Sequence, residues 1–339
     1  MRALVTGANG FLGSALLGRL IHHGIGNVRC LARPGSTARV EQIRAQFPGA
    51  DIAIETGNLT SRAAAESAVE GIDTIYHLAA GMRGAPADLV LNTVVTSRNL
   101  LDAATAAGVR RFVLVSSFSV YGVSSVPRGG IMDENTPLEA HPERRDPYAF
   151  AKLRQEQLFH EYQRRYGFEL VVLRPGTIYG PGGGAFSARV GIQLPGLFLH
   201  FGNGNRLPLT YVDNCAEALV AAAAASHATS DEVYNVVDDG IPTSRSYLRQ
   251  YRRAVRRIRT LSVPYPVTML LSRWCEAYHI RSKGQLPPLL TPYKSEFQWK
   301  GFRFTNAKLK SIGWRPVVTT EEGLRRTFEF LRAKESVPA

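Results

Sequence analysis

The stretch Ala3-Leu4-Val5-Thr6-Gly7-Ala8-Asn9-Gly10-Phe11-Leu12-Gly13 decides the fold of this 339-residue chain. A short apolar run leads into glycines spaced G-x-x-G-x-x-G, and a helical pattern follows over residues 13–23. Glycines here let the backbone turn tightly, so that a pyrophosphate can approach it and rest on the helix N-terminus. The alternative is a tight turn without a ligand, but the position between a strand and a helix favours a nucleotide. The predicted cofactor contacts in this turn are Gly7, Asn9, Gly10, Phe11, Leu12 and Gly13.

Short apolar runs alternate with helix-length segments through the first two thirds of the chain. This spacing predicts βαβ units and a parallel sheet. The runs are continuously apolar, which is typical of strands covered on both faces of a sheet. The expected strands are 3–6, 28–32, 51–56, 74–78, 112–116, 170–173 and 233–237. The expected helices are 13–23, 63–69, 90–107, 149–166 and 214–225.

Glycines and prolines between residues 175 and 184 interrupt this alternation. We therefore expect an α/β fold, a Rossmann-type doubly wound parallel sheet with a smaller C-terminal substrate-binding domain. The expected division is a dinucleotide-binding domain of residues 1–174 plus 209–239 and a substrate-binding domain of residues 175–208 plus 240–339.

The end of the second expected strand reads Cys30-Leu31-Ala32-Arg33-Pro34-Gly35-Ser36, without an acid. An acid at this place often binds the adenosine ribose of NAD. Arg33 and Ser36 could instead hold a 2′-phosphate, because a guanidinium forks onto phosphate oxygens. This favours NADP over NAD, unless Arg33 stacks on the adenine or faces water.

Tyr148 and Lys152 stand four residues apart and so share one helical face, at the start of the expected helix 149–166. A free tyrosine has a pKa of about 10, which a neighbouring cation lowers. Such a tyrosine can take a proton from a substrate hydroxyl while hydride leaves the same carbon. Ser116 and Ser117 end the expected strand 112–116, at the edge where open parallel sheets bind ligands. Read alone, the tyrosine and lysine would be ordinary surface neighbours.

Taken together, these segments resemble the extended short-chain dehydrogenase/reductase family, of the NAD-dependent epimerase/dehydratase type. The resemblance covers nearly the whole chain. It includes the glycine turn and the tyrosine–lysine pair. The other matching segments are G-N-L at 57–59, H-L-A-A at 77–80, Asn92, S-F-S-V-Y-G at 117–122, R-P-G-T-I-Y-G-P-G at 174–182 and Y-V-D-N at 211–214.

The resemblance implies a role for each matched residue. Ser117, rather than Ser116, would be catalytic and bind the substrate. Tyr148 would be the acid/base in contact with substrate and cofactor, and Lys152 would hold the cofactor ribose and tune Tyr148. A homodimer through helices of the nucleotide domain is also expected from the family. The further cofactor contacts that it implies are Asn58, Leu59, Leu78, Ala79, Ala80, Asn92, Pro175 and Thr177.

Departures from the family patterns narrow the expected chemistry. Phe118-Ser119 stands where 4,6-dehydratases carry an Asp-Glu pair, and no cysteine falls on a pocket motif as in 3,5-epimerases. The leading hypothesis is a nucleotide-sugar 4-epimerase, with Arg206 as a candidate diphosphate contact although it is shifted by one residue. The alternative is an oxidoreductase like 3β-hydroxysteroid dehydrogenase or dihydroflavonol reductase, to which 202–214 and 286–291 look somewhat closer. A non-catalytic NAD(P)-binding sensor is a remote third hypothesis.

The net charge of +13 is concentrated in residues 240–275, which hold eight arginines and no acid. Leu248, Tyr251, Val255 and Ile258 fall at helical spacing, with arginines on the other side. This predicts a surface helix with a basic face turned to water. The alternatives are a site for a diphosphate, or contact of residues 245–259 with acidic lipid headgroups. Stacking aromatics do not interleave with the basic residues, so nucleic acid is not expected.

Three cysteines are too few and too far apart for a disulfide framework or a zinc site, and the eight histidines show no metal-ligand spacing. We therefore expect no metal and a reducing compartment. The N-terminus lacks the pattern of a secretory signal, and no run approaches the ~20 apolar residues of a spanning helix. The expected location is cytoplasmic.

Overall fold

The computed structural model describes residues 1–186, 189–225, 231–282 and 290–336. A seven-stranded sheet of order β12-β7-β5-β4-β1-β2-β3 forms its centre, and every neighbouring pair is parallel. The chain runs outward from β1 in one direction and from β4 in the other. This makes the boundary between them the switch point, beyond whose strand ends open sheets bind ligands. The strands are β1 (Ala3–Thr6), β2 (Asn27–Ala32), β3 (Asp51–Thr56), β4 (Thr74–His77), β5 (Arg111–Val115), β7 (Glu169–Pro175) and β12 (Asp231–Val236).

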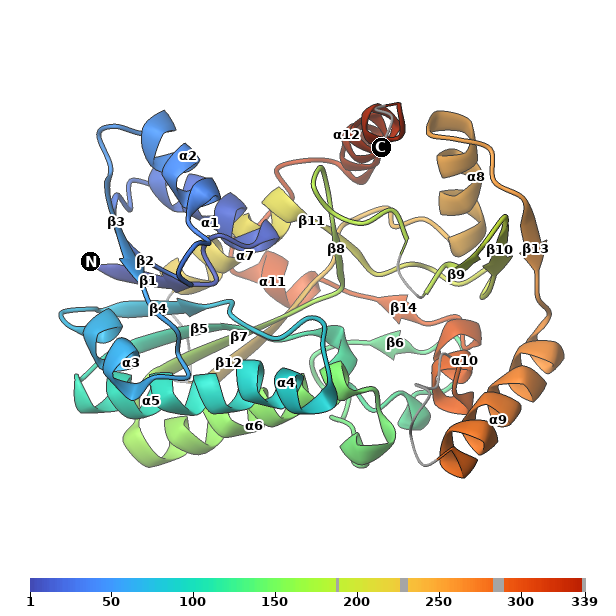
Figure 1. The fold of residues 1–339 in the computed structure, drawn as a ribbon, viewed down its shortest axis with the longest axis horizontal. Helices are drawn as coiled ribbons and strands as arrows, with labels where there is room; N and C mark the ends of the chain where they lie inside the picture. The colour runs from blue at the N-terminus through green and yellow to red at the C-terminus, as the bar shows by residue number, and fades with distance from the viewer. Residues whose placement is uncertain (187–188, 226–230, 283–289, 337–339) are drawn as a thin grey trace.

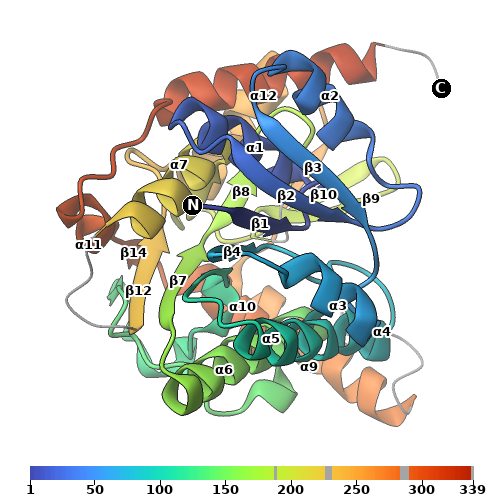
Figure 2. The same cartoon turned by 90° about the vertical axis from the view of Figure 1, so that its left-hand side faces the viewer.

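Helices cover both faces of the sheet (Figures 1 and 2). Alternate strand residues explain why: Val113 and Val115 of β5 belong to one apolar cluster, whereas Phe112 and Leu114 belong to the other. One face carries α1 (Phe11–His22), α2 (Ala38–Gln46) and α7 (Val212–Ala224), and the other carries α3 (Arg62–Val69), α4 (Pro86–Val90), the π-turn η1 (Leu91–Val95), α5 (Thr96–Ala106) and α6 (Pro147–Tyr166). The expected doubly wound α/β fold is thus confirmed.

The remaining strands form small sheets beyond the carboxyl edge of the large one (Figure 1). They are β8 (Thr177–Tyr179) with β11 (Leu209–Tyr211), β6 (Ile131–Met132) with β14 (Arg303–Phe304), and β9 (Gly191–Leu194), β10 (Leu197–His200) and β13 (Thr260–Ser262). The accompanying helices are α8 (Ser244–Ala254), α9 (Tyr265–Arg281), α10 (Pro292–Trp299), α11 (Ala307–Ser311) and α12 (Thr320–Glu335), and the single 3₁₀ turns are η2 (Phe118–Val120), η3 (Val123–Ser125) and η4 (Pro142–Arg144).

The division into two domains stays a prediction. Strands β8 and β11 pair with each other although the expected boundaries assign them to different domains. Strand β12 rejoins the large sheet after the chain has left it, as the expected strand 233–237 required.

The arginine-rich segment is helical for only part of its length. Leu248 and Tyr251 are buried as expected, but α8 ends at Ala254. Val255 and Ile258 therefore pack at the edge of the core from the segment after the helix. In the part of the chain that the structure describes, no helix is both long and apolar enough to cross a bilayer.

Candidate functional site

The glycine turn between β1 and α1 is as tight as its spacing predicts. Gly7 has a φ of +72°, which L side chains rarely adopt, and the Gly10 amide donates to its carbonyl over 2.9 Å. A Cβ on Gly13 would lie 2.2 Å from the Gly7 oxygen, so any side chain there would displace the turn. These two glycines hold the backbone close to the switch point of the sheet.

The start of α1 fits an anionic group. Its N-cap is Gly10, no side chain caps the first amides, and no acid occupies the first turn. The free amides and the helix dipole together favour negative charge, as a pyrophosphate would supply. The ring of Phe11 lies against Gly180 and Gly183, where added Cβ atoms would sit 3.3 and 3.4 Å from its Cζ atom. The glycine turn and the 174–182 segment thus meet at one place.

The loop after β2 is tied to the glycine turn by Asn9. Its amide donates to the Ser36 hydroxyl over 3.1 Å, and its carbonyl oxygen accepts from the Arg39 amide at 2.9 Å. Arg33 is exposed at the tip of β2, and its carbonyl accepts from the Ser36 amide at 2.9 Å. The predicted Asn9, Arg33 and Ser36 are therefore neighbours. Arg39, in the first turn of α2, adds a second arginine that the sequence reasoning missed.

The other predicted cofactor contacts lie along the same edge. Asn58 is exposed and Leu59 buried in the loop after β3, which Asn99 of α5 holds by donating to the Leu59 carbonyl over 2.8 Å. Leu78, Ala79 and Ala80 follow β4 and are partly buried, and Asn92 of η1 lies against Gly81. Pro175 ends β7, and the Thr177 amide donates to the Pro208 carbonyl at 2.6 Å.

Helix α6 presents the tyrosine and lysine in its first two turns. Asp146 caps it by accepting from the Ala149 amide at 3.1 Å, Pro147 begins it, and Gly167 ends it in the left-handed region at φ +73°. The local sequence therefore fixes where the helix starts, and with it the height of Tyr148 above the sheet.

Tyr148 and Ser117 meet at the carboxyl end of β5. The Ser117 side chain lies close enough to the phenol to influence its pKa, and its oxygen accepts from the Ser119 amide at 3.1 Å. Ser116 instead points inward and donates to Glu156. Burial raises the pKa of Tyr148, an effect that the Ser117 hydrogen bond opposes. The expected lowering by a neighbouring cation does not prevail here, so Tyr148 is a neutral phenol at neutral pH.

Lys152 lies one helical turn further and is almost fully buried. Its ammonium donates to the Val115 carbonyl and to the Gln155 side chain, both at 2.5 Å. Burial lowers the pKa of Lys152 to about 7, although the charge of Glu156 opposes the shift. The lysine thus changes its charge near neutral pH.

Behind Lys152 lies a buried polar network that joins residues of separate segments. Gln155 donates to the Ser97 hydroxyl at 2.8 Å, Ser97 lies 2.9 Å from His77 Nε2, and the other nitrogen of His77 lies 2.7 Å from the Thr6 hydroxyl. Burial lowers the pKa of His77 to about 3, so the ring is neutral. The network joins α6, α5, β4 and β1 under the site.

A buried ion pair supports the same helix. Arg174 of β7 donates to the Glu156 carboxylate at 2.5 Å, and both side chains are at least nine-tenths buried. Burial alone would raise the pKa of Glu156, but its bonds with His160, Arg174 and Ser116 hold that pKa at about 2. The guanidinium of Arg174 also lies 4.8 Å from the centre of the Tyr121 ring. Arg174, the first residue of the 174–182 segment, therefore lies beneath the site and does not line it.

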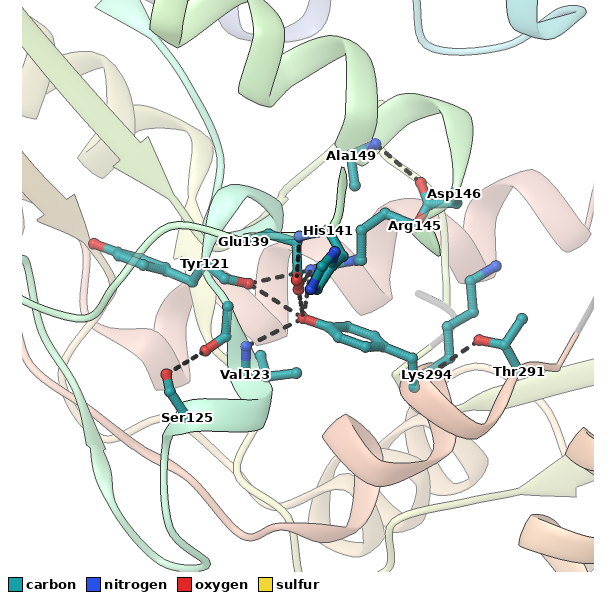
Figure 3. A network of polar contacts seen from close by, with 12 residues as sticks. Tyr121, Val123, Ser125, Glu139, His141, Arg145, Asp146, Ala149, Thr291 and Lys294 are labelled. Atoms are coloured by element: carbon teal, nitrogen blue, oxygen red, sulfur yellow. Dashed lines mark hydrogen bonds and ion pairs between the residues drawn. The ribbon is translucent and has the colours of Figure 1, made fainter. Parts of the chain in front are cut away.

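A second network positions the loop that precedes α6 (Figure 3). Arg145 donates to the Tyr293 hydroxyl at 2.7 Å and to the Tyr121 carbonyl at 3.1 Å. Tyr293, from α10, donates in turn to Glu139 at 2.5 Å. Burial raises the pKa of Tyr293, so its hydroxyl keeps its proton. Contacts between the C-terminal part and the 121–145 loops therefore help to place Tyr148.

Arg206 lies in the segment that precedes β11. It is exposed, and it donates to the Ile241 carbonyl at 3.3 Å. It lines a small cavity together with Arg189, whose guanidinium lies 4.2 Å from the centre of the Phe297 ring. Burial, reinforced by the nearby charge of Arg145, lowers the pKa of Arg189 to about 9. Sequence reasoning missed Arg189, because a single arginine after a glycine-rich segment carries no motif.

No cluster of three or more His, Cys, Asp or Glu side chains that could hold a metal ion occurs among the described residues. The polar groups at the switch point are hydroxyls, amides, one lysine and arginines. This donor set suits a phosphorylated organic ligand better than a cation.

Known proteins show the same arrangement of sequence and fold. UDP-glucose 4-epimerase of Mycolicibacterium smegmatis is 29% identical over 98% of this chain and 99% of its own. N-acetyl-alpha-D-glucosaminyl-diphospho-ditrans,octacis-undecaprenol 4-epimerase of Escherichia coli O157:H7 is 28% identical over 98% and 96%. The crystal structure of Thermus thermophilus UDP-glucose 4-epimerase in complex with NAD has a similar fold, with a TM-score of 0.71, 24% identity and coverage of 99% and 100%.

The sequence profile of one family matches residues 3–237, which include the glycine turn, Ser117, Tyr148, Lys152 and the 174–182 segment. The match extends through β12, the last strand of the large sheet. This chain belongs to the NAD dependent epimerase/dehydratase family.

Proposed function

We propose that this protein is a nucleotide-sugar 4-epimerase that uses a nicotinamide dinucleotide. The observation that supports it best is that Ser117, at the end of β5, lies close enough to Tyr148 to influence its pKa, with Lys152 one turn further along α6. Ser117 follows β5, the neighbour of β4, and the uncapped start of α1 that fits a pyrophosphate follows β1 on the other side of β4. The two relatives reported above with epimerase names support the same reaction class.

In this proposal each side chain of the trio has one task. The bound nicotinamide supplies a hydride acceptor that can also return the hydride. The phenol of Tyr148 must first lose its proton, which a protonated Lys152 favours; the phenolate then takes the proton of the substrate hydroxyl and gives it back at the end of the cycle. Ser117 holds the same oxygen, and Lys152 places a positive charge near the ribose and the phenol while it is protonated. No acidic pair follows Ser117, so elimination of water is not proposed.

The substrate diphosphate is assigned to Arg206 and Arg189. Both line one small cavity of about 10 Å³, so their side chains must move apart to admit the diphosphate, whose oxygens a guanidinium binds in pairs. The charge of Arg189 is influenced by that of Asp146, which caps α6 next to Tyr148.

The first test is to denature the purified protein and identify by mass spectrometry the nucleotide that it releases. We expect about one dinucleotide per chain, because an epimerase returns the hydride within a single turnover and has no need to exchange its cofactor. The same preparation should interconvert UDP-glucose and UDP-galactose. A preparation that releases no nucleotide, binds added NADPH and reduces ketones in stoichiometric amounts would instead establish the oxidoreductase alternative.

The finer cofactor assignment rests on the loop after β2. We propose that Arg33 and Ser36, with Arg39 beside them, favour NADP. Replacing Arg33 with alanine should then weaken NADPH binding by about tenfold to a hundredfold and leave NADH binding within about twofold, because only the phosphate contact is lost. Fluorescence titration of the nucleotide-free protein with both cofactors measures this, and Arg44→Ala on α2 is the matched control. Equal losses for both cofactors, or tightly held NAD in the first test, would refute the preference.

The homodimer and the cytoplasmic location expected from the sequence stay predictions. Exposed Leu91 and Val95 of η1 lie beside a hollow that Pro147 and Phe150 of α6 also line. We assign the dimer contact to this face of the nucleotide-binding part.

A further inference from the structure

Helix α9 carries an apolar stripe on its outer side. Val267, Leu271, Trp274 and Tyr278 follow one another at intervals of four, three and four residues, so they share one face. Their exposed fractions are 45, 38, 71 and 59%. A large apolar stripe of this kind on a surface helix marks a contact site.

The side of α9 that packs inward is made of small polar residues. Thr268 and Ser272 are fully buried, and the Ser272 hydroxyl lies 2.5 Å from that of Ser295 on α10. The helix therefore uses its hydroxyl face to join the protein and leaves its larger apolar residues to the outside. Its neighbours in sequence extend the exposed apolar surface, since Leu261 of β13 is 54% exposed.

The surroundings of this stripe are strongly basic. The segment 240–275 holds eight arginines and no acid. Arg256 pairs with Glu335 at 3.2 Å, but within the described residues no carboxylate lies within ion-pair distance of the exposed Arg257, Arg259 or Arg273. Helix α8, strand β13 and α9 follow one another along the end of the molecule opposite β3 (Figure 1). The charge and the apolar stripe thus occupy one end of the protein.

We propose that α9 and the basic segment before it dock this protein on the surface of an anionic lipid bilayer. Tryptophan and tyrosine suit the boundary between headgroups and acyl chains, where one part of the ring is apolar and one part is wet. Exposed arginines beside them attract acidic headgroups. The proposal goes beyond the epimerase activity and does not depend on it.

A second copy of the chain is a poorer occupant of this face. In a two-fold contact the same patch meets itself, so the basic segments of both copies would be brought together. Like charges at close range repel each other. Among the described residues of the patch, the acid closest in sequence to the arginines is Glu276. An acidic lipid surface satisfies the charge and the apolar stripe together.

Flotation of the full-length protein with lipid vesicles tests the docking. The protein should float with vesicles of phosphatidylcholine mixed with phosphatidylglycerol, and far less with phosphatidylcholine alone. Trp274→Glu should lower the partition coefficient at least about tenfold, because it places a charge in the apolar stripe. Tyr166→Glu, at the exposed C-terminal end of α6, is the matched control and should float like the wild type.

The triple variant Arg257→Gln, Arg259→Gln and Arg273→Gln tests the charge. It should bind the acidic vesicles about a hundredfold more weakly, because each basic residue near an anionic surface strengthens binding about fivefold. Circular dichroism and the midpoint of urea unfolding must match the wild type for each variant. A folded wild type that stays out of the floating fraction overturns the proposal. The proposal is also overturned if the Trp274→Glu protein floats like the wild type but differs from it in the mass measured by light scattering. The stripe would then be a contact between copies of the chain.

Discussion

Replacing Tyr148 with phenylalanine is expected to lower turnover by about a thousandfold and to leave dinucleotide binding almost unchanged. The substitution removes the hydroxyl whose pKa Ser117 influences and keeps the aromatic ring. A positioned acid or base contributes about a hundredfold to ten-thousandfold to a proton transfer. Steady-state rates of UDP-glucose and UDP-galactose interconversion measure the first effect, and fluorescence titration with the dinucleotide measures the second.

Tyr166→Phe provides a control on the same helix, because Tyr166 is 48% exposed at the opposite end of α6. It should keep wild-type turnover. If Tyr148→Phe also retained more than about a tenth of the rate, the phenol would not be the acid/base, since its removal would cost less than a positioned proton donor contributes.

Replacing Glu156 with glutamine is expected to lower the free energy of unfolding by about 3 kcal/mol or more, because Arg174 would be left buried without a counter-charge. Both side chains are at least nine-tenths buried, so solvent can compensate for little of the loss. Urea unfolding followed by circular dichroism at pH 7 measures the change. Glu322→Gln is the matched control, because Glu322 pairs with Arg325 and Arg326 on the surface of α12 and should contribute little.

The double variant Glu156→Leu with Arg174→Met separates the ion pair from the packing. Because neither charge then remains buried, it should regain much of the stability that Glu156→Gln loses. A single variant as stable as the wild type would mean that Arg174 finds another partner. The ion pair would then not be what holds β7 and α6 together.

The large sheet could be predicted because its strands are continuous apolar runs with helices of ordinary length between them. Strands such as 51–56 were expected within a residue of where they lie. The small sheets could not be predicted from the sequence. Strands β9, β10 and β13 have three or four residues each, and β13 pairs with β10 across about sixty residues of chain. Pairing at such a distance depends on the whole fold and leaves no local pattern.

The residues of the candidate site likewise form two groups, one that short motifs predict and one that only the fold brings together. The glycine turn, Ser117, Tyr148 and Lys152 lie in short motifs whose spacing is itself the signal. The groups that hold Lys152 are different, since Gln155 meets Ser97 and His77 only after α5, α6 and β4 have packed together. Burial also reversed one electrostatic expectation, because the pKa of Tyr148 is raised although a lysine lies one turn away.

The late return of β12 to the sheet has a consequence for synthesis on the ribosome. Strand β7 pairs with β5 on one side as soon as it emerges, but its other edge is completed only by residues 231–236. Until those residues leave the exit tunnel, the nascent chain exposes the bare edge of an apolar strand. Such an edge can pair with another unfinished chain. The interval between the synthesis of residues 175 and 231 is therefore when unfinished chains are most exposed to this pairing.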